Sequence, residues 1–420
     1  MHDADLLTSF FLIFSGAAVL ATGALYTRQP LLVAYIGIGV LLGPHGLALV
    51  TDPSLLAEIA EIGIIFLLFL LGLDMQPSKL LHMFRTTLLV GVASSLAFAG
   101  LGYGVAILSG FGFVDAILVG AAMMFSSTII GIKLLPTTVL HHKHTGEVVV
   151  SLLLLQDLIA IVLLIVLSSF SGSADAPPPW LPAIALPLGG LAAWAFVRWL
   201  LLPLLARFDV FQEYVFLVAI GWCLALAYGA AAVGLSHEIG AFAAGVTLAT
   251  SPIAQFMAEA LRPLRDFFLV LFFFTVGAAF DLSLAISVAL PALLLTTVML
   301  GGKPVIFRLL LNRFREQNVL AWEVGVRLGQ ISEFSLLLVF IALGTGVMSQ
   351  AAATLVQTTA IATFLLSSYL VVLQYPTPIA VDERLRRNRA PAAESSACGG
   401  IERLWRNGAA AAATSICSDT

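Results

Sequence analysis

Apolar segments about as long as a membrane is thick follow one another through most of this 420-residue chain. A transmembrane helix needs roughly 20 consecutive, predominantly apolar residues. Charged residues make up only 10% of the chain, whereas soluble proteins carry about 25%. The sequence therefore predicts an all-α polytopic membrane protein in a lipid bilayer. We expect about 13 transmembrane helices, at residues 8–25, 30–48, 55–73, 86–109, 114–134, 147–168, 181–203, 213–230, 234–250, 264–281, 285–307, 319–344 and 351–374.

The basic residues indicate how these segments are oriented. If the N-terminus lies outside, all but two of the 20 Lys and Arg residues fall on the cytoplasmic side. The two exceptions, Lys303 and Arg327, lie within apolar segments. Because cytoplasmic loops carry an excess of Lys and Arg, we expect an outside N-terminus and a cytoplasmic C-terminus. The membrane would be the plasma membrane, which in a bacterium is the inner membrane.

The composition changes near residue 378. Residues 1–378 hold all the apolar segments, whereas residues 379–420 are basic and then rich in Ala and Ser. We expect a transmembrane domain over 1–378 and a disordered cytoplasmic tail over 379–420. The membrane part has no basic block suited to nucleic acid, and Cys223, Cys398 and Cys417 match no metal spacing. We therefore expect no nucleic-acid partner, no cofactor and no resident metal ion.

Thirteen segments can form two six-helix halves separated by the seventh segment. The second half would then run in inverted orientation, as is common in secondary transporters. The fifth segment of each half has small or polar residues at mid-depth, at Phe125–Gly131 and Gly329–Ser335. Polar backbone at that depth is tolerated only where it is buried in protein or lines a water-filled cavity. The sequence therefore predicts two inverted six-helix repeats with crossed interrupted helices.

Asp157 lies near the middle of the apolar run from Ser151 to Leu167. A carboxylate at the bilayer centre costs roughly 2.5–3.5 kcal/mol on insertion scales, so it indicates function by default. It can hold a proton or a cation, and the two would compete for one site exposed alternately to each side. The alternative is a carboxylate held by a structural ion pair. Gln156 could offer its carbonyl oxygen to the cation or hydrogen-bond a neighbouring helix.

Three further charged residues lie within apolar segments. Lys303 could neutralise Asp157 when no ion is bound, or it could extend its ammonium to the membrane surface. Glu333, in the second interrupted segment, could bind a cation or form a structural ion pair with Lys303 or Arg327. Oxygen atoms that suit hard cations, or that hold helices together, come from Ser126, Ser127, Thr128, Gln330 and Ser332.

The His141–His144 tract resembles a metal-binding sequence but lies in a basic cytoplasmic connection. A solvated loop is the simplest interpretation, and pH sensing is the main functional alternative.

An ordered set of motifs resembles the second family of monovalent cation:proton antiporters, which includes the potassium-efflux antiporters. The resemblance covers about residues 8–375, and Ser332 stands where that family has glycine. The motifs are Gln156-Asp157, Glu61–Asp74, Phe125–Thr128, Gly240–Gly245, Pro263–Phe268, Phe272–Gly277 and Gln330–Ser335.

The resemblance implies a sodium/proton-antiporter-like fold with 13 membrane spans, a homodimer, and a core domain that moves like an elevator against a dimer domain. It also implies Asp157 as the ion carrier, with Lys303 matching the family's basic residue. The activity that the resemblance implies is electroneutral, one-for-one exchange of Na⁺ or K⁺ for H⁺. Many potassium-efflux members carry a nucleotide-binding domain after the last helix, and we expect no such domain in this chain.

Two other classes of function compete with antiport. A channel or a sensor could use the same scaffold. An intramembrane enzyme is disfavoured because the chain lacks the motifs of rhomboid, aspartyl and zinc intramembrane proteases.

Overall fold

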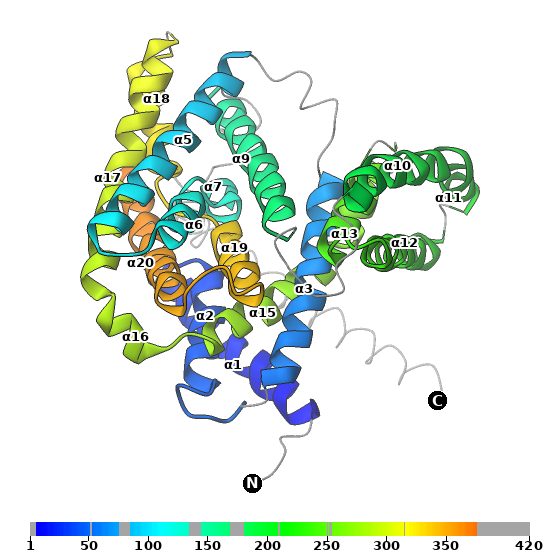
Figure 1. Cartoon of the computed structure of the whole chain (residues 1–420), viewed down its shortest axis with the longest axis horizontal. Helices are drawn as coiled ribbons and strands as arrows, with labels where there is room; N and C mark the ends of the chain where they lie inside the picture. The colour runs from blue at the N-terminus through cyan, green and yellow to red at the C-terminus, as the bar shows by residue number, and fades with distance from the viewer. Residues whose placement is uncertain are drawn as a thin grey trace, which may run out of the picture.

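The computed structural model describes residues 6–50, 53–74, 85–133, 144–168, 180–208, 211–249, 251, 254–314 and 316–375. The regular elements in this part of the chain are all helices (Figure 1). They are α1 (Leu6–Tyr26), α2 (Leu31–Leu42), α3 (Pro53–Asp74), α5 (Arg85–Leu108), α6 (Phe113–Met123), α7 (Thr128–Lys133), α9 (His144–Ser168), α10 (Trp180–Phe196), the π-helix η1 (Val197–Leu201), α11 (Leu202–Phe208), α12 (Gln212–Ala232), α13 (His237–Ala249), α14 (Ala254–Ala260), α15 (Arg262–Ala278), α16 (Leu282–Ser287), α17 (Ala289–Arg313), α18 (Asn318–Arg327), α19 (Glu333–Gly344) and α20 (Gln350–Gln374).

The chain is an all-helical, multi-span membrane protein. Each predicted segment coincides with one helix or with consecutive helices. Segment 114–134 is divided into α6 and α7, and segment 319–344 into α18 and α19. Among the described residues, seven helical stretches are long and apolar enough to cross a membrane: α1, α5, α9, α10 with α11, α12, α17 and α20. The interrupted helices fall below that length because each is split at mid-depth.

Contacts between helices divide most of them into two groups, and in Figure 1 α10, α11, α12 and α13 of the second group stand apart on the right. The core bundle contains α5, α6, α7, α9, α17, α18, α19 and α20, and the flanking group contains α1, α2, α3, α10, α11, α12, α13 and α15. One apolar cluster includes Leu68 and Phe272 of the flanking group together with Val119 and Phe364 of the bundle. The rings of Phe272 and Phe340 of α19 lie 6.3 Å apart, edge to face. The two groups therefore meet through apolar side chains.

The flanking group contains two helix crossings at which backbones touch. A Cβ on Gly39 of α2 would lie 2.1 Å from the Phe274 carbonyl oxygen of α15. A Cβ on Gly277 of α15 would lie 2.1 Å from the Ile36 oxygen of α2. Only glycine permits this approach, because a side chain would overlap backbone atoms that cannot rotate away.

The crossing of α3 with α13 is built in the same way. A Cβ on Gly72 would lie 2.5 Å from the Phe242 oxygen, and one on Gly245 would lie 2.1 Å from the Phe69 oxygen. The two glycine crossings join α2 to α15 and α3 to α13, and α15 also packs against α3, so the four helices form one closely packed unit.

Helix contacts in the first part of the chain have counterparts in the second. The pair α1–α2 corresponds to α12–α13, and the pair α5–α6 corresponds to α17–α18. The contact of α2 with α15 corresponds to that of α13 with α3, and the contact of α5 with α9 to that of α17 with α20. The core bundle is thus assembled from two similar sets of helices.

Candidate functional site

Serine side chains begin the second part of each interrupted helix. The hydroxyl of Ser127 accepts a hydrogen bond of 3.1 Å from the Ile130 N–H at the start of α7. The hydroxyl of Ser332 accepts one of 3.1 Å from the Phe334 N–H at the start of α19. Serine is favoured at such positions because its oxygen satisfies an N–H group that has no partner within the helix. These short polar motifs explain why helices start again at Thr128 and Glu333.

The two helix breaks contact each other in the middle of the core bundle. Ser126 Oγ donates a hydrogen bond of 2.8 Å to the Leu328 carbonyl oxygen. Gln330 Nε2 donates one of 3.5 Å to the Ser127 carbonyl oxygen. The polar backbone that the breaks expose is therefore partly satisfied by the other break, as burial in protein requires.

Lys303 of α17 is fully buried, with no exposed side-chain surface. Its ammonium donates to the carbonyl oxygens of Phe125, at 2.6 Å, and Gln330, at 3.0 Å, and to Ser126 Oγ at 3.3 Å. Phe125 and Gln330 follow the ends of α6 and α18, where helix dipoles favour a positive charge. Lys303 therefore holds both breaks, and its ammonium does not extend to the membrane surface. Among the described ion pairs, none joins Lys303 to Asp157.

Asp157 lies beside the first break and is 1% exposed. Its carboxylate accepts a hydrogen bond from the Thr128 hydroxyl, which lies 3.2 Å from one oxygen and 3.1 Å from the other. The neighbouring Gln156 is fully buried, and its carbonyl oxygen accepts a hydrogen bond of 3.0 Å from the Ser126 N–H. Of the two roles that the sequence suggested for Gln156, the geometry shows the contact with a neighbouring helix.

Arg327 and Glu333 stand on either side of the second break. The buried Arg327 side chain forms two contacts of 2.9 Å with the carboxylate of Glu323, one turn earlier in α18, and lies over the Tyr375 ring. Sequence reasoning did not select Glu323 as its partner. Glu333 is the first residue of α19, where the N-terminal N–H groups favour a negative charge.

Two residues of α20 that sequence reasoning missed also contact the second break. Ser367 Oγ donates a hydrogen bond of 2.8 Å to Gln330 Oε1. The hydroxyl oxygen of Thr363 accepts one of 3.3 Å from the Ile331 N–H. Their spacing was a signal, because Thr359, Thr363 and Ser367 recur every four residues and therefore share one face of an apolar helix.

The described residues contain no group of three or more His, Cys, Asp or Glu side chains that could hold a metal ion. Beside the first break, the site instead combines the Asp157 carboxylate with hydroxyl groups and carbonyl oxygens, which are ligands that suit a hard cation.

Residues 10–372 match the family description "Sodium/hydrogen exchanger, transmembrane". The chain belongs to the sodium/hydrogen exchanger family. This is a family of transporters and not of enzymes. The match includes both helix breaks, Asp157 and Lys303.

Known proteins of the exchanger family resemble the chain in sequence and in structure. It is 31% identical over 321 residues to K(+) efflux antiporter 4 of Arabidopsis thaliana and 29% identical over 325 residues to K(+) efflux antiporter 5 of the same plant. Each alignment covers 74% of this chain and respectively 54% and 56% of the relative, so the chain spans about half the length of these proteins. The sodium proton antiporter MjNhaP1 of Methanocaldococcus jannaschii shares the fold, with a TM-score of 0.67 and 16% identity over 88% of this chain and 98% of that one.

Proposed function

We propose that this exchanger-family chain carries Na⁺ or K⁺ in one direction and H⁺ in the other, through alternate binding at Asp157. The observation that carries the proposal is a single carboxylate, 1% exposed, beside a helix break in the core bundle. Both similar plant proteins are named as K(+) efflux antiporters, and the protein of similar fold is named as a sodium proton antiporter.

One shared carboxylate is sufficient for coupled exchange. Protonated Asp157 is neutral and cannot hold a cation, whereas ionised Asp157 can bind one. Thr128 can keep its hydrogen bond to the carboxyl group in either state, because its hydroxyl contacts both oxygens. Since Lys303 is bonded to carbonyl oxygens and not to Asp157, one proton exchanges for one monovalent cation and transport is electroneutral.

The contact between the helix groups supports an elevator-type movement of the core bundle. Phe272 of the flanking group, Phe340 of the core bundle and their apolar neighbours form the boundary between the two groups. An apolar boundary can slide without breaking specific polar bonds. The glycine crossings keep α2, α3, α13 and α15 together as the support.

The matched helix contacts support two inverted repeats and 13 spans. With the N-terminus outside, α9 begins on the cytoplasmic side and Asp157 lies near mid-depth in the plasma membrane. We extend the proposal to a homodimer formed through the flanking group. Apolar residues exposed on that group, among them Leu217 and Tyr228 of α12, suit contact with lipid or with a second copy.

The test is proton movement in everted membrane vesicles after Na⁺ or K⁺ is added across a range of pH. Asp157→Asn should abolish cation-driven proton release. Asp281→Asn is the matched control, because Asp281 is exposed and caps α16 outside the core bundle. Unchanged exchange in Asp157→Asn would overturn the assignment of Asp157 as the carrier.

A channel or sensor on the same scaffold is the second candidate. A channel differs from an antiporter in two measurable properties. It conducts ions without coupling to a pH gradient and at rates far above those of transporters, whereas an antiporter moves one proton for each cation.

A further inference from the structure

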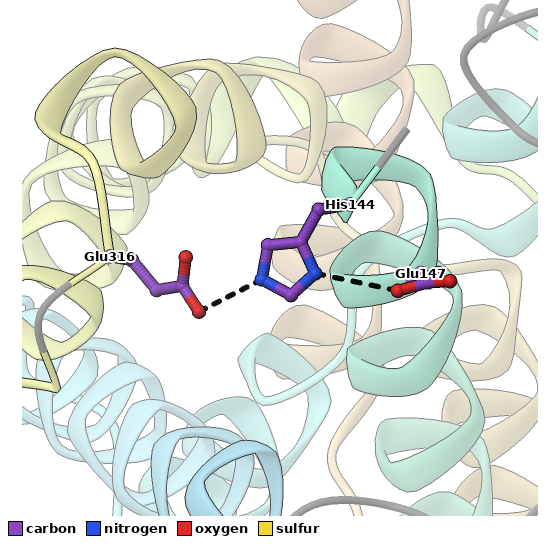
Figure 2. A network of polar contacts seen from close by, with 3 residues as sticks. All are labelled: His144, Glu147 and Glu316. Carbon is purple, nitrogen blue, oxygen red and sulfur yellow. Dashed lines mark hydrogen bonds and ion pairs between the residues drawn. The ribbon is translucent and has the colours of Figure 1, made fainter. Parts of the chain in front are cut away.

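His144 fastens the beginning of α9 to another part of the core bundle (Figure 2). Its Nε2 lies 3.0 Å from Glu316 Oε1, and its Nδ1 lies 3.4 Å from Glu147 Oε2. Glu147 is on α9 itself, whereas Glu316 lies in the connection between α17 and α18. One imidazole therefore links the helix that carries Asp157 to the start of the second interrupted helix.

A corresponding contact lies at the other end of the bundle. Asp115, in the first turn of α6, accepts a hydrogen bond of 2.9 Å from the N–H of Ser349, the residue that caps α20. Both contacts join the start of an interrupted helix to the start of the last helix of the other helix set. The chain runs from α6 through the first break into α7, and α9 follows. The start of α9 therefore lies at the opposite end of the bundle from the start of α6.

The two contacts differ in one chemical respect. Histidine changes its charge between about pH 5 and pH 8, and the contact of Asp115 with a backbone N–H contains no such group. A protonated imidazole attracts both carboxylates as an ion pair, whereas a neutral ring can donate from only one of its nitrogens. About half of the His144 side chain, 52%, is exposed, so protons can reach it from water.

Two other charged groups in this part of the bundle have partners of their own. On α17, Arg308 donates to the Asn318 side chain and lies over the Trp322 ring. On α18, Glu323 is bound by Arg327. Among the described residues, Glu147 and Glu316 are the carboxylates in contact with the His144 ring.

We propose that His144 is a positioning residue for Asp157, which holds α9 against the α17–α18 connection while protonated and releases it when neutral. The inference builds on the proposed transport function, and it makes the geometry of the ion site depend on the pH at the end of the bundle where α9 begins. Under the proposed topology this is cytoplasmic pH.

Thermal unfolding of the purified protein tests the contact without any transport. Wild type should unfold about 1–2 °C above His144→Gln at pH 5.5, since an exposed ion pair is worth up to about 1 kcal/mol. The difference should vanish at pH 8.5. Asp115→Asn, at the opposite end, should lower the unfolding temperature equally at both pH values. An equal effect of His144→Gln at both pH values would overturn the proposal.

Exchange assays in proteoliposomes test the positioning role. At pH 6, His144→Gln should raise the KM for the cation about two- to five-fold with kcat unchanged. At pH 8.5 the variant and wild type should agree, and Glu316→Gln should behave like His144→Gln. A KM unaffected at pH 6 would refute the positioning role. Absence of exchange in the wild-type protein would instead refute the proposed function, and the unfolding experiment would still decide whether the contact depends on protonation.

Discussion

Replacement of Lys303 by methionine should destabilise the core bundle. Methionine is unbranched and one heavy atom shorter than lysine, so the substitution keeps most of the side chain and removes its charge. The ammonium forms bonds of 2.6 and 3.0 Å to the Phe125 and Gln330 carbonyl oxygens, and a hydrogen bond to a charged group contributes about 1.5–3 kcal/mol. We take the lower value for each bond, because the variant also removes the cost of burying an ammonium group. The expected loss in the free energy of unfolding is therefore about 3 kcal/mol.

The measurement is denaturant or thermal unfolding of purified Lys303→Met, alongside cation-driven proton movement in vesicles. Val305→Met is the matched control, because Val305 lies two residues further along α17 and is 46% exposed. The reasoning is refuted if Lys303→Met is as stable as wild type and the pH profile of its exchange is displaced. That result would mean that Lys303 acts on Asp157 directly, as the charges in the sequence suggested, and not through the helix breaks.

Two further predictions concern packing and the second break. Gly245→Ala should lower the free energy of unfolding by about 1–3 kcal/mol, because its Cβ would lie 2.1 Å from the Phe69 carbonyl oxygen. Gly221 has open space around it, so Gly221→Ala should be neutral or stabilising by up to about 1 kcal/mol in the same denaturant or thermal unfolding assay. Ser367→Ala should cost about 1 kcal/mol of stability by removing the bond to Gln330, and rescue of that loss by Ser367→Thr would support the hydrogen bond as its cause.

The helices and the two breaks could be predicted from the sequence because both arise from local chemistry. Each apolar segment must satisfy its backbone within a helix, so hydropathy alone gave segments that coincide with the helices described. The breaks coincide with serine residues whose side chains cap the next helix, at Ser127 and Ser332. Such signals lie within a few residues of the structure that they specify.

The partners within the site could not be predicted in the same way. Lys303 and Phe125 are 178 residues apart, and their contact depends on how two interrupted helices cross. Sequence reasoning suggested partners by opposite charge, so it considered Asp157 for Lys303 and Glu333 for Arg327. The structure bonds Lys303 to carbonyl oxygens, because half-helix ends offer partial charges that no residue letter reveals. Arg327 is bound to Glu323, one turn earlier in its own helix.

The contacts at the helix breaks lead to opposite expectations for the two buried charges of the site. Lys303 is held by three oxygen atoms, so its charge is part of what keeps the breaks together. Asp157 accepts hydrogen bonds from one side-chain hydroxyl, that of Thr128, and its burial is costly while it is ionised. Asp157→Asn should therefore unfold at the same temperature as wild type or higher, even though it abolishes exchange. If Asp157→Asn were instead destabilised as strongly as Lys303→Met, the carboxylate would be a structural group and a different residue would have to carry the ion.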